Sequence, residues 1–480
     1  MNIGMILDMA ASAGSRSVIT VGDRSLSAAD LIDLARRAAP RFHEHSAVLY
    51  LGANHLAYPV ALFGAVLAGV PFVPLNYRLG DAQLRALLER HPGALILRPE
   101  DLDALVAVDP AQPGAPELPT PWDADSVAVI LYTSGTTSAP KAALLRHRHL
   151  MAYLLNTVEF GAAATTDATL VSVPPYHIAG LTNLLSNLYA GRRVVYLSAF
   201  DPAEWLATVR RERITQAMLV PTMLARIVAE VDGPDAGTPT LATLAYGGSR
   251  MPRPVLDRAL RVFPETGFVN AYGLTETASS VAVLGPEDHR AAAASDDPLV
   301  RERLGSVGRA LPGIEFEIRS AAGEPVAVGE TGLVVVRGDQ ISGEYGGRSA
   351  LDADGWFPTG DLGKLDDAGY LFIDGRADDT IIRGGENIAP AEIEDVLLEY
   401  PGITEAAVIG VSDPEWGQRL VAVVVGVGIG EEGQIKQWVK DRLRSSKTPD
   451  AIVFRAELPK TDTGKLLRRN LVAELEDTHA

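Results

Sequence analysis

Short apolar runs alternate with stretches of helical period over most of the chain, and this alternation is the strongest constraint on its fold. Runs such as "SVAVILY", "RRVVYL" and "QAMLV" have the length of buried strands, whereas "AEWLATVRRERI" repeats its apolar residues at helical spacing. Strands that alternate with helices are typical of α/β domains with largely parallel sheets. The chain has 480 residues, which is enough for a substantial core and for more than one domain.

The pattern changes near residue 305, where short strands separated by turn residues follow one another, as in "GIEFEIRS", "TGLVVVRG" and "GYLFIDG". Such a series indicates an antiparallel or barrel-like portion. The last hundred residues then mix helices with strands. We therefore expect a large N-terminal domain at residues 1–377, made of α/β subdomains plus a β-barrel-like portion, and a small α+β domain at residues 378–480.

Composition excludes several classes of function. Acidic residues outnumber basic ones by 61 to 43, a net charge of -18, which argues against binding to nucleic acid or to anionic membranes. The absence of cysteine excludes disulfides and thiolate zinc sites. The uncharged stretch from Leu56 to Leu75 contains three prolines, so we expect a buried helix and a short strand there rather than a membrane span. The N-terminus lacks a basic signal-peptide region, and we expect a cytoplasmic location.

A hydroxyl-rich loop, "TSGTTSAPK" at residues 133–141, follows a strongly apolar strand. Ligands collect at the carboxyl ends of parallel strands, and hydroxyls, backbone N–H groups and a lysine suit phosphate oxygens. The glycine spacing is not that of a P-loop, and Ala142 follows the lysine where a P-loop has Ser or Thr. Ser138 and Lys141 match an S-x-x-K hydrolase motif, but its S-D-N and K-T-G partners are missing. An ordinary polar loop remains an alternative at this point.

Three further stretches carry residues that could bind a base, a ribose, phosphates or a metal ion. In "NAYGLTETAS", Tyr272 can stack on a base, and Glu276 can bind Mg²⁺, although a helix N-terminus would use similar residues. In "GWFPTGDLGKLDDAGYLFIDGRADD", Asp361 and Arg376 could hold a ribose or form a simple salt bridge. Near the C-terminus, Lys465 follows a Thr-Gly turn.

The order and spacing of these motifs resemble the adenylate-forming superfamily of acyl-CoA ligases, luciferases and peptide-synthetase adenylation domains, from about residue 25 to 472. The resemblance implies an acid–thiol ligase. A carboxylic acid would attack the α-phosphate of ATP, pyrophosphate would leave, and the thiol of CoA would then displace AMP from the acyl-adenylate. ATP, Mg²⁺ and CoA are the implied cofactor and co-substrates.

The resemblance also implies roles for individual residues. Lys465 would contact the carboxylate and the α-phosphate, with Thr275, Glu276 and His177 as further catalytic residues, and Glu276 and Thr133 would bind the metal. The implied nucleotide-binding residues are Thr133, Ser134, Gly135, Thr136, Thr137, Lys141, Ala271, Tyr272, Gly273, Thr275, Asp361, Ile373, Arg376 and Lys465.

The remaining implied roles concern the acyl group and CoA. The small domain would be a mobile lid that rotates about a hinge at Asp378 between the two half-reactions. "HIAGLTN" lacks the aspartate that amino-acid adenylation domains use for an α-amino group, so we expect an acid without one. The implied acyl-binding residues are His177, Tyr246, Gly247 and Gly248, and the implied CoA-binding residues are Gly384, Gly385 and Lys447.

The chain departs from the family pattern in the phosphate loop. The family has T-S-G-T-T-G-x-P-K-G, and Ser138 and Ala142 stand here at the two later glycines. Glycine permits positive φ and close backbone approach. We therefore considered an alternative enzyme with impaired adenylation, which would mainly transfer the acyl group of a supplied acyl-adenylate. A protein that binds nucleotide or acyl-adenylate without turnover is a second alternative, disfavoured by Glu276 and Lys465.

Overall fold

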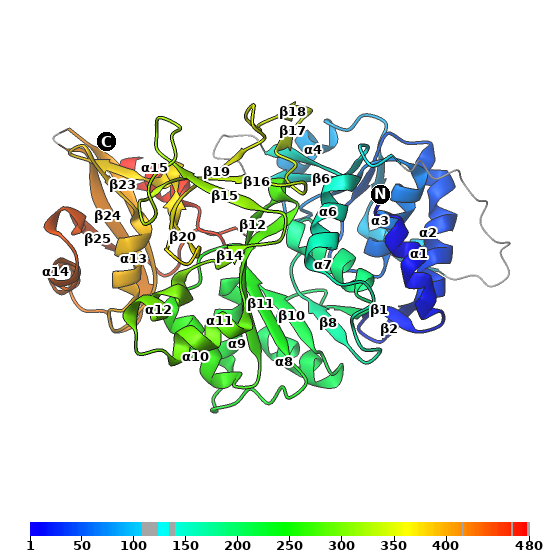
Figure 1. Ribbon diagram of the computed structural model, residues 1–480, viewed down its shortest axis with the longest axis horizontal. Coiled ribbons are helices and arrows are strands. Elements are labelled where there is room, and N and C mark those ends of the chain that lie inside the picture. Colours follow the sequence, from blue (N-terminus) through cyan, green and yellow to red (C-terminus); the bar gives the residue numbers. More distant parts are fainter. Residues whose placement is uncertain (108–122, 134–139, 415, 462–463, 478–480) are drawn as a thin grey trace.

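The computed structural model describes residues 1–107, 123–133, 140–414, 416–461 and 464–477. Its strands form five sheets, two of them large, with helices packed against them (Figure 1). The α-helices of the larger, N-terminal part are α1 (Met5–Ala10), α2 (Ala28–His43), α3 (Ala57–Ala68), α4 (Asp81–Leu88), α5 (Pro99–Leu105), α6 (His147–Thr157), α7 (Ile178–Tyr189), α8 (Pro202–Arg211), α9 (Pro221–Glu230), α10 (Arg253–Val262), α11 (Pro286–Ala294) and α12 (Pro298–Glu302).

The first large sheet has nine strands in the order β14-β13-β12-β11-β10-β8-β9-β1-β2. Its central strands, from β12 to β1, run parallel, and antiparallel strands close both edges. This confirms the expected α/β build. The strands are β1 (Ser17–Val21), β2 (Arg24–Ser27), β8 (Ala168–Val171), β9 (Arg193–Tyr196), β10 (Gln216–Leu219), β11 (Thr243–Gly247), β12 (Gly267–Leu274), β13 (Ser279–Leu284) and β14 (Arg309–Ala310).

The second large sheet has the order β18-β17-β7-β6-β4-β3-β5. Its strands β5, β3, β4 and β6 are parallel, and β7 then returns antiparallel to β6. One hydrophobic core serves both large sheets and includes residues from α1 to η3 (Arg303–Gly305). The strands are β3 (Val48–Tyr50), β4 (Phe72–Pro74), β5 (Leu95–Leu97), β6 (Val127–Thr133), β7 (Lys141–Arg146), β17 (Glu344–Tyr345) and β18 (Arg348–Ser349).

The uncharged stretch at residues 56–75 is buried inside this core. All but one of the α3 residues, from Ala57 to Ala68, are buried, and the helix ends at Gly69, which adopts the left-handed conformation common at helix C-termini. Strand β4 follows at once. Among the residues that the structure describes, every helix is too short or too polar to span a bilayer.

The region after residue 305 forms the expected antiparallel structure. Four strands pair in the order β15-β16-β19-β20, and all of these pairs are antiparallel. Side chains of this sheet pack on residues at the end of β12, including Tyr272. The sheet therefore stands beside the carboxyl edge of the first large sheet. Its strands are β15 (Glu315–Arg319), β16 (Gly332–Arg337), β19 (Phe357–Leu365) and β20 (Leu371–Arg376).

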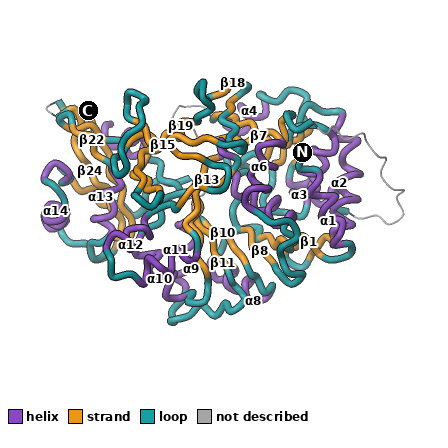
Figure 2. The backbone as a smooth tube through the Cα atoms, viewed as in Figure 1, coloured by secondary structure: helices purple, strands orange, loops and turns teal. Residues whose placement is uncertain are grey.

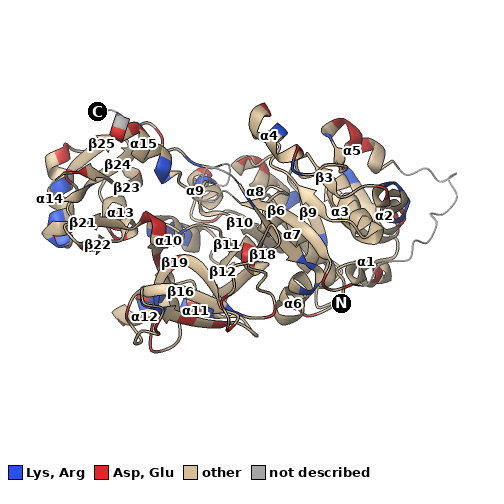
Figure 3. Cartoon of the chain, turned by 90° about the horizontal axis from the view of Figure 1, so that it is seen from above, with Lys and Arg blue, Asp and Glu red and all other residues tan. Residues whose placement is uncertain are grey.

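The C-terminal part has hydrophobic clusters of its own, which draw only on residues from Ile381 onward. Figures 1 and 2 show it as a separate body at one end of the molecule, and Figure 3 shows it beside the larger part from above. Arg250 links the two parts through an ion pair with Asp395. The elements are β21 (Ile381–Arg383), β22 (Glu386–Ile388), α13 (Pro390–Leu398), β23 (Ile403–Asp413), β24 (Gly417–Gly426), α14 (Glu432–Arg442), β25 (Ala451–Phe454) and α15 (Arg468–Asp477).

Candidate active site

The end of β12 supplies the first group of predicted site residues. The strand runs through Tyr272 and Gly273 directly into the short helix η2 (Thr275–Thr277). A Cβ atom on Gly273 would lie 2.0 Å from the backbone oxygen of Ser279, so only glycine lets β13 approach here. Ala278 and Ser279 have φ values of 53° and 120°, conformations that non-glycine residues seldom adopt. Backbone strain of this kind is concentrated at functional sites.

Asp361 and Arg376 face each other across β19 and β20, where they are register partners. Arg376 donates a 2.8 Å hydrogen bond to one carboxylate oxygen of Asp361, and the Tyr272 hydroxyl donates a 2.5 Å bond to the other. Burial raises the pKa of Tyr272, and the nearby Asp361 carboxylate raises it further, so the phenol stays protonated. The structure thus brings the predicted ribose pair together with the predicted adenine-binding tyrosine. Ala271 lies on β12, and Ile373 lies on β20.

The two ends of the phosphate loop also lie together. Thr133 ends β6, Lys141 begins β7, and the two are register partners. The predicted loop residues between them, Ser134, Gly135, Thr136 and Thr137, together with Ser138, lie outside the described residues. Among described residues other than glycine, positive φ occurs at Arg213, Ala278 and Ser279. Ala142 therefore sits in β7 without the strain that the missing glycine led us to expect.

Glu276 is the candidate metal ligand, and its side chain is 8% exposed. The Tyr345 hydroxyl donates a hydrogen bond to its carboxylate. The described residues include no group of three or more His, Asp or Glu side chains that could hold a metal ion. A metal at Glu276 would therefore take its remaining ligands from phosphate oxygens or water, which fits the preference of Mg²⁺ for a carboxylate or two together with substrate phosphates.

Lys465 reaches this site from the C-terminal tail. Its backbone N–H donates a 3.0 Å bond to the Thr461 hydroxyl, and Gly464, with φ of 77°, packs against Thr222 at the start of α9. The pKa of the Lys465 ammonium is lowered, chiefly because protein atoms displace water around it and also because Arg376 lies nearby. The carboxylates that oppose this shift include Asp361 and Glu276. Lys465 thus lies in the electrostatic field of the ribose pair and the candidate metal ligand, and it keeps access to solvent.

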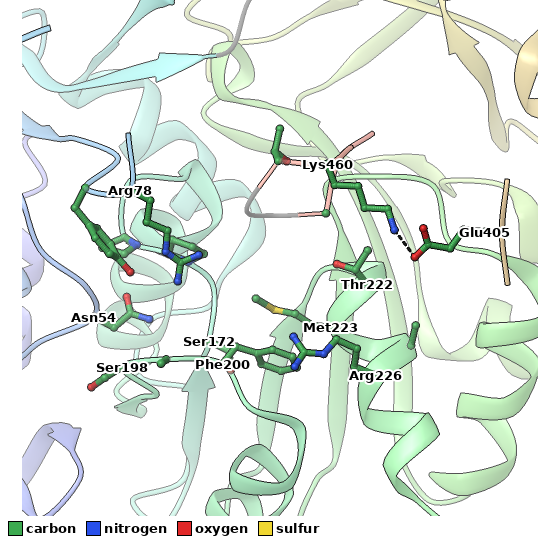
Figure 4. Close-up of a pocket in the computed structure, with 17 residues that line it drawn as sticks. Asn54, Arg78, Ser172, Ser198, Phe200, Thr222, Met223, Arg226, Glu405 and Lys460 are labelled. Carbon is green, nitrogen blue, oxygen red and sulfur yellow. Dashed lines mark hydrogen bonds and ion pairs between the residues drawn. The ribbon is translucent and has the colours of Figure 1, made fainter. Parts of the chain in front are cut away.

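A cavity of about 560 Å³ opens between the larger part and the loop that carries Lys465 (Figure 4). Asn54 and Ser172 are 4% and 5% exposed, and the Asn54 side-chain oxygen and the Ser172 hydroxyl have no hydrogen-bond partner within the described part of the chain. Buried polar atoms in this state are rare in folded proteins and are usually satisfied by water or a ligand. No motif or residue spacing in the sequence indicated this cavity. Its wall also includes Arg78, Pro174, Pro175, Phe200, Arg226, Lys460 and Thr461.

The predicted acyl-binding residues take different positions. His177 is the N-cap residue of α7, and its ring lies 4.6 Å from that of Tyr176. Tyr246 is fully buried, and its hydroxyl lies 2.9 Å from Nε2 of His289 in the core. Gly247 and Gly248 follow at the carboxyl end of β11.

The predicted CoA-binding residues lie apart from this site. Gly384 and Gly385, with φ of 57° and 81°, form the turn of the β21–β22 hairpin, and Gly384 packs against Trp416 of the same small part. The Lys447 ammonium forms an ion pair with Glu392. The predicted hinge residue Asp378 lies in η4 (Ala377–Asp379), the connection between β20 and β21.

Comparisons with known proteins cover both parts of the chain. A family model described as "AMP-binding enzyme" matches residues 8–345, and one described as "AMP-binding enzyme C-terminal domain" matches residues 392–465. A feruloyl-CoA synthase from an Amycolatopsis species is 38% identical over 448 residues, which cover 88% of this chain and 87% of the relative. An indoleacetate–CoA ligase from Aromatoleum aromaticum is 34% identical, with 95% of both chains covered.

A solved structure has the same architecture over nearly the whole length. It is the o-succinylbenzoate coenzyme A synthetase of Bacillus subtilis in complex with ATP and a magnesium ion. The TM-score is 0.81 at 28% identity, with 97% of this chain and 98% of that chain covered.

Proposed function

Because the chain belongs to the AMP-binding enzyme family and is an AMP-forming acid–thiol ligase that uses ATP, Mg²⁺ and CoA, we propose that its substrate is a carboxylic acid without an α-amino group. The observation that carries the activation chemistry is the placement of Lys465 near Glu276 and near the hydrogen-bonded pair of Asp361 and Arg376. These four residues come from three distant segments. Their arrangement suits one polyphosphate and one carboxylate side by side.

In the first half-reaction, a carboxylate oxygen of the acid attacks the α-phosphorus of ATP. The new oxygen–phosphorus bond gives the acyl-adenylate, and the bond to pyrophosphate breaks. Lys465 places its charge beside the attacking carboxylate and the α-phosphate, which are both anionic, and so lowers the barrier. Asp361 and Arg376 hold the ribose, and Thr275 contacts the α-phosphate. Glu276 and Thr133, the last residue of β6, would hold Mg²⁺. The bound ion would neutralise phosphate charge.

In the second half-reaction, the CoA thiol attacks the acyl carbonyl carbon, a carbon–sulfur bond forms, and AMP leaves with the bonding electrons. We assign the 560 Å³ cavity as the approach of the thiol arm. The arm of CoA contains amide groups, which can satisfy the unpartnered oxygens of Asn54 and Ser172. Arg78 and Arg226, which line the same cavity, suit the phosphates of CoA.

The cavity wall includes the loop with Lys460, Thr461 and Gly464, so the thiol and Lys465 compete for the same approach. We propose that residues 378–480 rotate as a lid about Asp378 between the two half-reactions. The rotation withdraws Lys465 and turns the Gly384–Gly385 hairpin, with Lys447, toward CoA. The separate hydrophobic clusters after Ile381 support a part that moves as a unit.

Two observations bear on the acid itself. The segment "HIAGLTN" at the start of α7 contains no acidic residue to pair with an α-amino group. The three proteins compared above are named for feruloyl, indoleacetate and succinylbenzoate substrates, which all contain an aromatic ring. We therefore expect aryl-substituted acids to be the preferred substrates, with His177 beside the carboxylate.

The test is a panel of acids assayed for pyrophosphate exchange and for CoA consumption. The panel holds aryl-substituted acids, fatty acids and amino acids. We expect exchange that depends on an added aryl acid, and acyl-CoA formation when CoA is added. Turnover confined to amino acids, or no acid-dependent exchange with any member, contradicts the proposal.

Replacing Lys465 tests the observation that carries the proposal. We expect Lys465→Ala to lower the rate of acid-dependent exchange about a hundredfold or more, because a positioned charge on the transition state is lost. Lys440 on α14 is an exposed lysine of the same domain, and Lys440→Ala is the matched control. Equal rates in wild type and Lys465→Ala would refute the role of Lys465.

A further inference from the structure

A short segment, residues 342–346, connects the strand after the phosphate loop to the candidate metal ligand. The backbone N–H groups of Ser342 and Gly343 donate 2.9 Å and 3.1 Å hydrogen bonds to the backbone oxygen of Glu276. Tyr345 pairs with Ala143 of β7, and the N–H of Gly346 donates a 3.1 Å bond to the oxygen of Ala142. The segment therefore fixes the Glu276 backbone relative to β7, which begins at Lys141.

The side chain of Tyr345 also links Glu276 to the start of β7. Its hydroxyl donates a hydrogen bond to Oε1 of Glu276, and the Lys141 ammonium lies 5.5 Å from the centre of its ring. A cation over an aromatic face is attracted to it. One side chain thus contacts both the candidate metal ligand and the lysine that the family resemblance assigns to the phosphates.

An ion pair holds the segment in place. Arg146, the last residue of β7, donates bonds of 2.9 Å and 2.8 Å to the two carboxylate oxygens of Glu344. Bidentate arginine–carboxylate pairs fix geometry as well as distance. Because Glu344 precedes Tyr345 on β17, this pair also restrains the position of the tyrosine.

From these contacts we propose that Tyr345 is a positioning residue for ATP, which holds the Glu276 carboxylate for Mg²⁺ and keeps Lys141 beside it. The proposal rests on the proposed function, in which Glu276 would bind the metal, and on the phosphate-binding role that the family resemblance implies for Lys141. Side chains that orient a metal ligand commonly alter metal affinity by tenfold or more when they are replaced. Tyr345 would therefore determine how well the protein binds ATP with Mg²⁺, and not how well it binds AMP.

The experiment compares wild type with Tyr345→Phe, which removes the hydroxyl and keeps the ring. Calorimetry measures binding of ATP at a series of Mg²⁺ concentrations, without acid so that no reaction occurs. We expect the Mg²⁺ concentration for half-maximal ATP binding to rise about tenfold in Tyr345→Phe. Binding of AMP, which lacks the β- and γ-phosphates, should stay within about twofold of wild type.

Tyr370→Phe is the matched control. The Tyr370 hydroxyl also donates to a carboxylate, at 2.6 Å from Asp288, but this pair lies outside the proposed site. We expect Tyr370→Phe to leave both ATP and AMP binding unchanged. A loss of AMP binding in Tyr345→Phe equal to the loss of ATP binding would show general damage to the site and overturn the proposal.

A second variant measures the contribution of the Tyr345 ring to ATP binding. Tyr345→Leu removes the hydroxyl and the aromatic face beside Lys141, so we expect weaker ATP binding than in Tyr345→Phe. Two failures are distinguishable. If the wild-type protein binds ATP equally well with and without Mg²⁺, the proposed function is refuted. If ATP binding by the wild-type protein depends on Mg²⁺ and Tyr345→Phe shows the same dependence, only the role of Tyr345 is refuted.

Discussion

The surroundings of Lys465 act on its pKa in opposite directions. Surrounding protein and Arg376 lower the pKa of the ammonium, whereas Asp361, Asp379 and Glu276 raise it, and the net result is a lowered pKa. The proposed role of Lys465 requires the charged ammonium group. Because its pKa is lowered, the side chain loses this charge at a lower pH than an ordinary lysine does. Its function therefore has an upper pH limit below that of an ordinary lysine.

The pH dependence of the two half-reactions tests this point. The proposed role of Lys465 needs the protonated form, which predominates below its pKa, so acid-dependent pyrophosphate exchange should fall as pH rises through that lowered value. The thioester half-reaction, started from supplied acyl-adenylate, should not show this fall, because rising pH increases the reactive CoA thiolate. Rate profiles up to about pH 10 measure both. An identical fall in the two half-reactions would contradict the role.

At the scale of single elements, the strand ends were the most predictable features. The apolar run "SVAVILY" predicted β6, and Thr133 lies at its carboxyl end. Thr275 directly follows β12, at the edge where ligands of α/β sheets bind. The pairing of Asp361 with Arg376 follows from hairpin register, which the fifteen-residue spacing allowed but did not determine. Asn54, Ser172 and Tyr345 could not be predicted, since only the packed chain brings them to the site.

The Tyr246 side chain shows another limit of sequence patterns. Its neighbours Gly247 and Gly248 matched the expected acyl wall, but alternation along β11 decides which side chains face the core. The ring of Tyr246 lies on the core side against His289. Resemblance to a family motif does not determine the direction of a single side chain, which depends on the register of the strand in the folded sheet.

Gly247 gives a prediction for the contact between β11 and β12. A Cβ atom there would lie 2.2 Å from the backbone oxygen of Ala271, so Gly247→Ala must push the two strands apart. We expect it to destabilise the protein by about 2 kcal/mol, as overpacking does, and to weaken AMP binding because Tyr272 follows Ala271. Gly305→Ala is the control, since a Cβ on Gly305 meets no atom within 4 Å. Thermal unfolding and AMP titration measure the effects, and equal stability of the two variants would contradict the steric argument.

At the scale of the whole molecule, two bodies with separate cores meet along a few polar contacts. Gly464 packs on Thr222, and the Arg250 guanidinium pairs with the Asp395 carboxylate of α13. Both partners of this ion pair are more than two-fifths exposed, so the pair contributes at most about 1 kcal/mol. A contact of that strength can bias the orientation of the C-terminal part without locking it, which suits the proposed rotation of residues 378–480 between the two half-reactions.

Removing this ion pair should therefore shift the balance between the half-reactions. We expect Arg250→Glu to slow acid-dependent pyrophosphate exchange by about two- to fivefold, because the orientation with Lys465 in the site loses up to about 1 kcal/mol. The thioester half-reaction should not slow. The double variant Arg250→Glu with Asp395→Arg restores an opposite-charge pair and should recover most of the exchange rate. Failure of the double variant to recover would indicate that residue 250 acts by another route.

The pH dependence of pyrophosphate exchange provides a second test of the ion pair between Arg250 and Asp395. Burial raises the pKa of Asp395 to about 6, and Arg250 opposes this rise while neighbouring glutamates add to it. The carboxylate is charged above that pH and neutral below it, so the pair exists only on the alkaline side. The effect of Arg250→Ala on exchange should therefore be present at pH 7.5 and largely absent at pH 5. An effect of equal size at both pH values would mean that Arg250 contributes through packing rather than through its charge, and the lid would then be biased by shape alone.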